Sequence, residues 1–241
     1  MEPSGDVQAN TETADTPAPT QVHTLAVQDI RQAQTAEKVS IAIRTHLWIA
    51  WARIALKHEA TARAARQEML RPGADQYRLL LQEADAGLAG ICAAAFALEA
   101  LSRELRELGA IRQATLDRCR QKRKEGKGPA AKKVVLEVLS QTIDTGGRHT
   151  SWRDELGWLF DLRDISVHYE GAFAPSEPHP LGMSVAPEQV AYLAENVTRA
   201  VDLLLAILEW CRDRPKPAAR KWSQGMRGAI NNLIGRRVHA E

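Results

Sequence analysis

Residues 80–108 have the sequence LLQEADAGLAGICAAAFALEALSRELREL, and this stretch decides the fold class. Its apolar residues recur every three or four positions, which places them on one face of a helix. They are Leu80, Ala84, Leu88, Ile91, Ala95, Leu98, Leu101, Leu105 and Leu108. The helix is predicted over residues 75–108, with Gly109 as its stop. Gly87 and Gly90 destabilise a helix interior, so we expect a neighbouring element to approach closely there.

Helical spacing recurs on both sides of this stretch. One long helix is predicted to end at Pro72-Gly73, and others cover residues 132–143, 151–170 and 187–214. Ser151 and Asp154 fit a capping box that would begin the third of these. The expected core faces are Val39, Ile43, Leu47, Trp51, Ile54 and His58; Val135, Val138, Leu139 and Thr142; Trp152, Leu156, Leu159, Phe160 or Leu162, and Ile165; and Val190, Leu193, Val197, Val201, Leu204 and Leu208. The fold class is therefore predicted to be all-α, a helical bundle of about five main helices.

Composition supports a soluble helical protein. Of the 241 residues 44% are hydrophobic and only 5% are aromatic, with alanine and leucine dominant, which favours helices over sheets. The three cysteines form no CxxC pair, so we expect no zinc site, no disulfide framework and a reduced, cytoplasmic location. The N-terminus does not resemble a signal peptide, and the longest apolar run, residues 88–98, is too short to span a bilayer. No membrane association is predicted.

The chain divides into three regions. Residues 1–24 are rich in Thr, Pro, Asp and Gln and are predicted to be a disordered leader, with a partner-binding tail as the alternative. Residues 36–212 form the bundle. Residues 213–241 form a basic tail that includes a candidate short amphipathic helix through Met226, Ile230, Leu233 and Ile234. That helix could dock on the bundle, contact nucleic acid or, least favoured because its apolar face is small, touch a membrane.

A charged group interrupts the otherwise apolar helix after residue 151. Arg163, Asp164 and His168 lie within six positions. Asp164 and His168 are four apart and share a face, whereas Arg163 and His168 point about 140° apart and are separated by about 7.5 Å of helix rise. Because the guanidinium stem is long, one phosphate lying along the helix could meet both side chains.

These residue types suit cleavage of RNA by its own 2′-hydroxyl. Histidine titrates near neutrality and can transfer protons, arginine stays charged and binds phosphate oxygens in bidentate fashion, and Asp164 could orient the imidazole or favour its charged form. This chemistry needs neither a metal nor a cofactor. The other interpretation of the three residues is a surface charge cluster on a packed helix.

The motif resembles that of the HEPN domain family, in which an Arg and a following polar residue precede a His by four to six intervening residues. Phe96-Ala97-Leu98-Glu99-Ala100-Leu101 is also similar to the second helix of many HEPN proteins. The resemblance implies a metal-independent ribonuclease that pairs two motif helices in a homodimer and leaves 2′,3′-cyclic phosphate and 5′-hydroxyl ends. Arg53 and His58 have the same spacing, but no polar residue follows Arg53.

A basic stretch precedes the motif. Residues 118–133 hold eight basic side chains and one acid, Glu125. The RNA-contact candidates are Arg120, Lys122, Arg123, Lys124 and Lys127, which would bind phosphates by counterion release. The alternative is a solvated loop between helices. No aromatic residue is present for base stacking, so sequence-specific recognition is not expected there.

Two functional hypotheses follow from the sequence. The first is an endoribonuclease, a toxin or defence effector restrained by an inhibitory protein partner, in which Arg163 stabilises phosphate and His168 moves protons. The second is a non-catalytic helical module for dimerisation or RNA binding. Four further histidines, His46, His58, His149 and His179, are treated as structural by default. Of these, His149 lies in the loop next to the start of the motif helix and His179 follows the motif in a Pro-rich loop, so both could contribute to the site.

Overall fold

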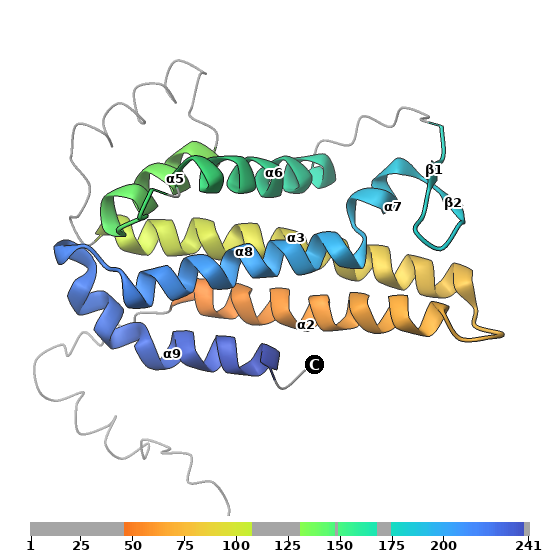
Figure 1. Ribbon diagram of the computed structural model, residues 1–241, viewed down its shortest axis with the longest axis horizontal. Coiled ribbons are helices and arrows are strands. Elements are labelled where there is room, and N and C mark those ends of the chain that lie inside the picture. The colour runs from red at the N-terminus through yellow and green to blue at the C-terminus, as the bar shows by residue number, and fades with distance from the viewer. Residues whose placement is uncertain (1–45, 108–130, 148, 168–174, 239–241) are drawn as a thin grey trace, which may run out of the picture. The chain divides into compact units, whose positions relative to one another are not determined.

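The predicted central helix is present as α3, Gln76–Glu107. The computed structural model describes residues 46–107, 131–147, 149–167 and 175–238 (Figure 1). The predicted leader, His168 and the RNA-contact candidates of the basic stretch lie outside these residues. Of the described residues, 82% are helical, which confirms the all-α fold class.

The described elements are six helices of twelve or more residues and a few short pieces. The helices are α2 (Leu47–Met69), α3, α5 (Ala131–Thr142), α6 (His149–Val167), α8 (Ala194–Asp213) and α9 (Arg220–Val238). The short pieces are β1 (Glu177–Pro178), β2 (Ser184–Val185), α7 (Pro187–Ala191) and η1 (Pro217–Ala219), with β1 and β2 antiparallel. All of them belong to one folded unit, Thr45–Glu241.

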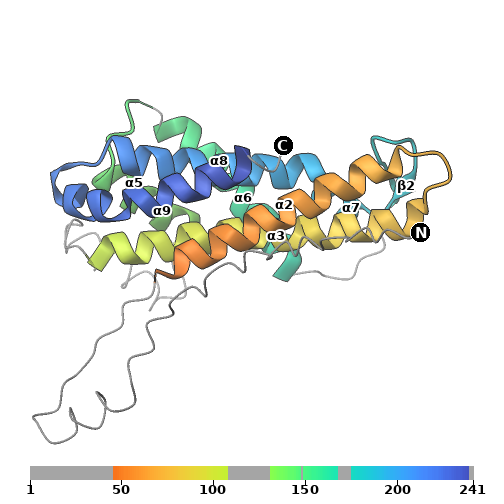
Figure 2. The same ribbon diagram turned by 90° about the horizontal axis from the view of Figure 1, so that it is seen from below.

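The helices pack in layers within this unit. Helix α3 contacts α2, α8, α5 and α6, while α9 contacts α8 and α2. Figure 1 shows α5 and α6 on one side of α3 and α8, with α2 and α9 on the other side, and Figure 2 shows α9 alongside α2 from below. The middle layer therefore separates α6, which carries Arg163, from α9.

Close packing against α3 confirms the role predicted for its glycines. A Cβ at Gly87 would overlap the carbonyl oxygen of Tyr192, and one at Gly90 would overlap the Val197 side chain. A single helix was predicted over residues 187–214. The backbone of Leu193 is extended and interrupts this helix, so α7 and α8 are separate. The chain between α7 and α8 thus lies directly on α3.

The predicted core faces agree with the structure except on α2 and α6. On α5 the buried residues are the four predicted ones, Val135, Val138, Leu139 and Thr142. On α2 the prediction is wrong: Leu47 is 59% exposed and Ile54 38%, whereas Trp48 and a row of alanines are buried. Small side chains let α2 approach α3 closely. The face of α2 that carries alanines is therefore buried, and the face with the larger residues is not.

Helix α6 also begins and packs differently from the prediction. It starts at His149, so Ser151 lies inside the helix and is exposed rather than capping its start. Trp152, Leu156, Leu159 and Phe160 are buried as predicted, but Ile165 is 42% exposed. Residue 165 therefore adds an apolar side chain to the surface next to Arg163 and Asp164.

Helix α3 also has the length and apolar composition of a membrane span. In the bundle, 56% of its most apolar window is buried. The tail helix is longer than predicted: α9 covers 19 residues and docks on the bundle through Trp222, Ile230 and Leu233.

Candidate functional site

Arg163 lies in the last turn of α6 and faces α3. Its Nε donates to Asp164 Oδ1 at 2.9 Å and its Nη2 to the same oxygen at 2.7 Å, while Nη1 donates to Glu99 Oε1. The guanidinium also lies over the Phe160 ring, 4.9 Å from its centroid. Glu99 belongs to the α3 segment that resembles the HEPN second helix, so the two segments that carry the resemblance are in contact.

The two carboxylates keep Arg163 charged. Partial burial by itself lowers the pKa of Arg163, but hydrogen bonds and charge from Asp164 and Glu99 outweigh it and raise this pKa above its ordinary value. The Arg163 side chain is 15% exposed and that of Asp164 is 48% exposed, so the pair lies at the surface rather than in the core. The charges of the two carboxylates offset that of the guanidinium, so these three side chains together carry no excess of positive charge.

Further contacts fix the turn of α6 that carries Arg163. Ser166 Oγ donates to the Arg163 carbonyl at 2.6 Å and lies 3.4 Å from Cys92 Sγ on α3. Tyr192, at the end of α7, donates its hydroxyl to the Leu162 carbonyl at 3.4 Å. The helix end that precedes His168 is therefore held by α3 and by the α7–α8 junction.

The remaining site predictions fall into three groups. His168 lies outside the described residues, so the role predicted for Asp164 toward its imidazole stays a prediction. The RNA-contact candidates at 120, 122, 123, 124 and 127 also lie outside, but nearby Lys132 is described and pairs with Asp161 at 2.7 Å. The second Arg–His spacing is on α2, where Arg53 is exposed and His58 half-buried.

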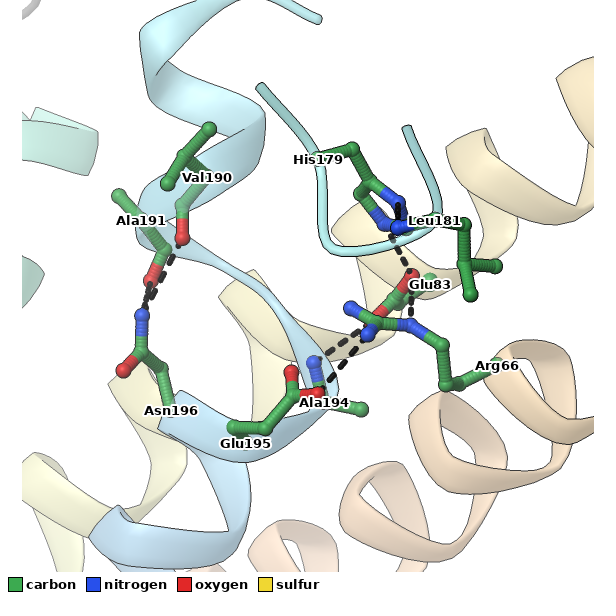
Figure 3. Close-up of polar contacts among 9 residues, drawn as sticks. All are labelled: Arg66, Glu83, His179, Leu181, Val190, Ala191, Ala194, Glu195 and Asn196. Carbon is green, nitrogen blue, oxygen red and sulfur yellow. Dashed lines mark hydrogen bonds and ion pairs between the residues drawn. The ribbon is translucent and has the colours of Figure 1, made fainter. Parts of the chain in front are cut away.

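His179 belongs to a different cluster, shown in Figure 3. Its side chain is fully buried, and Nε2 lies 3.3 Å from Glu83 Oε2. Nδ1 accepts a hydrogen bond from the Leu181 N–H at 3.2 Å. The ring hydrogen is therefore on Nε2, which donates a hydrogen bond to Glu83 Oε2. His179 thus fixes the β1–β2 turn to α3, and its structural interpretation is supported.

Glu83 is the centre of this cluster. Arg66 on α2 donates to it through Nε at 3.2 Å and Nη2 at 2.6 Å, and the backbone N–H of Ala194 donates to it at 2.7 Å. The carboxylate therefore satisfies a free N–H at the start of α8, where its negative charge also matches the helix dipole. Next to it, the Asn196 side chain donates to the Val190 and Ala191 carbonyls and closes the end of α7.

Neither Glu83 nor its contacts with Arg66, His179 and Ala194 were predicted from the sequence. The available signal was an acid three residues after Leu80 and four before Gly87, on the face predicted to be buried. A buried acid at such a position requires partners, but their identity depends on residues 17 to 111 positions away. Only the tertiary fold brings them together.

The described residues contain no candidate metal site, and the chain has no match among known proteins. Among the described residues, no group of three or more His, Cys, Asp and Glu side chains is arranged to hold a metal ion. Comparison of the chain with models of protein families, with curated proteins and with solved structures finds no match. The residues and their geometry are therefore the basis for any functional assignment.

Proposed function

We propose that the chain is a cytoplasmic, metal-independent endoribonuclease of the HEPN type, with Arg163 and His168 at its active site. The observation that carries the proposal is the contact between Arg163 and Glu99. It joins the two segments whose sequences resemble the family, which lie 64 residues apart in the chain.

Arg163 is the proposed phosphate ligand. A guanidinium has five N–H donors, and the contacts with Asp164 and Glu99 use three of them. Two donors are left for the oxygens of a scissile phosphate. Asp164 and Glu99 act as positioning residues, because they hold the guanidinium in place and maintain its charge.

His168 is the proposed acid and base. It takes the proton from a ribose 2′-hydroxyl, whose oxygen attacks the adjacent phosphorus. The new O2′–P bond forms a 2′,3′-cyclic phosphate as the P–O5′ bond breaks. The leaving 5′-oxygen takes a proton from the protonated His168 of a second copy, so the products are a cyclic phosphate and a 5′-hydroxyl.

This mechanism includes a homodimer paired through α6. Exposed Ile165, two residues before the end of that helix, supplies an apolar contact for such a pairing. A nuclease of unrestricted specificity would harm its own cell, so the proposal extends to a toxin or defence effector held inactive by an inhibitory protein.

The test is RNA cleavage by the purified full chain in EDTA. Arg163→Ala and His168→Ala are each expected to lower the cleavage rate by at least about 100-fold, because each removes a group that acts in the transition state. Arg53→Ala and His58→Ala are the matched controls, since they remove the same residue types at the same spacing on α2, and cleavage should persist. Melting curves establish that each variant is folded, and end-group analysis should find cyclic phosphate.

A second candidate function is a non-catalytic helical module. The specific observation in its favour is that two carboxylates neutralise Arg163, as in a purely structural ion-pair cluster. This candidate predicts no cleavage of any RNA by the wild type. Cleavage that survives both Arg163→Ala and His168→Ala would instead assign the activity to other residues.

A further inference from the structure

Helix α9 has an unusual charge composition. Its 19 residues include Arg220, Lys221, Arg227, Arg236 and Arg237 and not one Asp or Glu. The whole chain has 32 basic and 30 acidic residues, so the residues outside α9 have 27 bases against 30 acids. Helix α9 is therefore, like residues 118–133, a segment with a large local excess of basic residues.

Helix α9 has a buried side and an exposed side. Trp222, Ser223, Ile230 and Leu233 are buried, and they turn toward α8 and α2. Four of the five basic residues are exposed, and the exposed side also carries amides; its members are Arg220, Lys221, Gln224, Arg227, Asn231, Asn232 and Arg236. At about 100° per residue these seven occupy roughly half of the helix circumference.

Most of these charges are left for an external partner. Arg237, the fifth basic residue, is bound by Glu59 at 2.9 Å and by Asp202, so it holds α9 to the bundle. Within the described part of the chain, Arg220, Lys221 and Arg236 form no ion pair with an acidic side chain, although Arg236 donates to the Asn232 amide oxygen at 2.9 Å. Arg236 also lines a cleft of about 170 Å³ between α9 and α2, together with Arg63, Arg237 and Glu59.

We propose that the exposed side of α9 binds the phosphate backbone of a nucleic acid. The four exposed basic residues, Arg220, Lys221, Arg227 and Arg236, span about 24 Å along the helix, which matches the rise of about seven base pairs. Guanidinium, ammonium and amide groups are the usual donors to phosphate and sugar oxygens. The described side has no aromatic residue for stacking, so the binding is insensitive to base sequence.

The same surface fits other partners less well. A helix that enters a membrane surface exposes large apolar residues beside its basic ones, whereas none of the exposed large hydrophobic residues described in this structure is on α9. An acidic protein would need its own row of carboxylates at a matching spacing. A polynucleotide has the required regular charge by its chemistry alone.

This binding surface is separate from the proposed active site. Helix α9 lies across the α3 and α8 layer from α6 (Figure 1). A protein with no cleavage activity would still bind through it, so the two proposals can fail independently. If both proposals are correct, the α9 surface holds one part of a long RNA while the active site on α6 cuts another part of the same RNA.

The test is binding of the full chain to a fluorescent 2′-O-methyl RNA of about 20 nucleotides, which spans the helix and lacks the hydroxyl needed for cleavage. One variant replaces the four exposed basic residues of α9 with Gln. The matched control replaces Arg71, Arg78, Arg103 and Arg153 with Gln, which removes the same charge from exposed positions outside α9. Duplex DNA of the same sequence and vesicles with anionic lipid are the other probes.

The α9 variant is expected to lose at least about tenfold in affinity and to lower the salt slope by about 0.7 for each lost contact, while the control binds like the wild type. Replacement of Arg220, Arg227 and Arg236 by Lys should retain binding, which guards against loss of the fold. The proposal is overturned if the α9 variant binds as tightly as the wild type. It is also overturned if the α9 and control variants lose the same affinity. Binding to vesicles without binding to RNA or DNA also overturns it, in favour of a lipid surface.

Discussion

A single side chain, Glu83, joins four parts of the structure. It is 1% exposed and binds Arg66 of α2, His179 of the β1–β2 turn and the first N–H of α8, while it belongs itself to α3. A buried carboxylate is stable only when its charge and lone pairs are satisfied, and here both oxygens have two donors each. The pairing therefore stabilises one arrangement of these elements over others.

Replacing Glu83 with Ala is expected to destabilise the protein by about 3–5 kcal/mol, because Arg66 and the Ala194 N–H would lose a buried acceptor. Glu195→Ala is the matched control. It removes another carboxylate bound to Arg66, at 2.8 Å, but Glu195 is 61% exposed, so the loss should be below about 1 kcal/mol. Urea unfolding of both variants measures the difference, and equal effects would show that burial of Glu83 contributes little.

The sequence predicted single residues unevenly. Arg163 and Glu99 were identified from local patterns, and the fold brings them into contact. The contact between these two residues was not predicted, because they lie 64 positions apart in the chain. The Glu83 cluster could not be predicted, because no local pattern relates an acid to a histidine 96 residues away.

At the scale of elements, glycines set how closely helices approach. Gly87 and Gly90 were predicted to mark a close approach, and Tyr192 before α8 and Val197 on α8 occupy the space where their side chains would be. The predicted face of α5 was confirmed, because valine and leucine at helical spacing identify a core face clearly. The face of α2 was predicted wrongly, because its core is made largely of alanine, which is also common on exposed helix surfaces.

Gly87→Ala is expected to destabilise the protein by about 2 kcal/mol, because the new methyl group would overlap the Tyr192 backbone. The matched control is Gly228→Ala on α9, where nothing lies within 4 Å of the added carbon. Both glycines are helical, with φ outside the left-handed region. The control should therefore stabilise by about 0.5–1 kcal/mol through the better helix propensity of alanine. Thermal melting distinguishes the two signs, and a neutral Gly87→Ala would contradict the packing described for α3.

At the scale of the whole folded unit, ion pairs connect the last helix to the first described one. Glu59 on α2 is 2% exposed and pairs with Arg237 on α9. Burial raises the pKa of Glu59, and Arg237 and Thr198 offset only part of that effect. The docking of α9 thus depends on a carboxylate that ionises less readily than a solvent-exposed one.

This pKa gives the stability a defined pH dependence. The folded pKa of Glu59 lies above the ordinary value of 4.5, so between the two values the folded protein binds more protons at this group than the unfolded chain does. The free energy of unfolding contributed by Glu59 therefore increases as the pH falls through that interval. Relative to Glu59→Gln, which does not titrate, the wild type should gain stability as the pH is lowered from neutral to about 5. A wild type that loses stability relative to the variant over this range would contradict the raised pKa.

Helix α9 combines its basic side with three glycines, Gly225, Gly228 and Gly235, none of which has another atom within 4 Å of the Cβ position. Each weakens the intrinsic tendency of the segment to be helical, so an isolated α9 would be mostly unstructured in water. Contacts with α8 and α2 supply the missing stability. Its amides are therefore expected to exchange with solvent by local detachment of this one helix, at a lower free energy than opening of α3. The ordered row of charges exists only while α9 is docked, so a partner that binds the row also suppresses this opening.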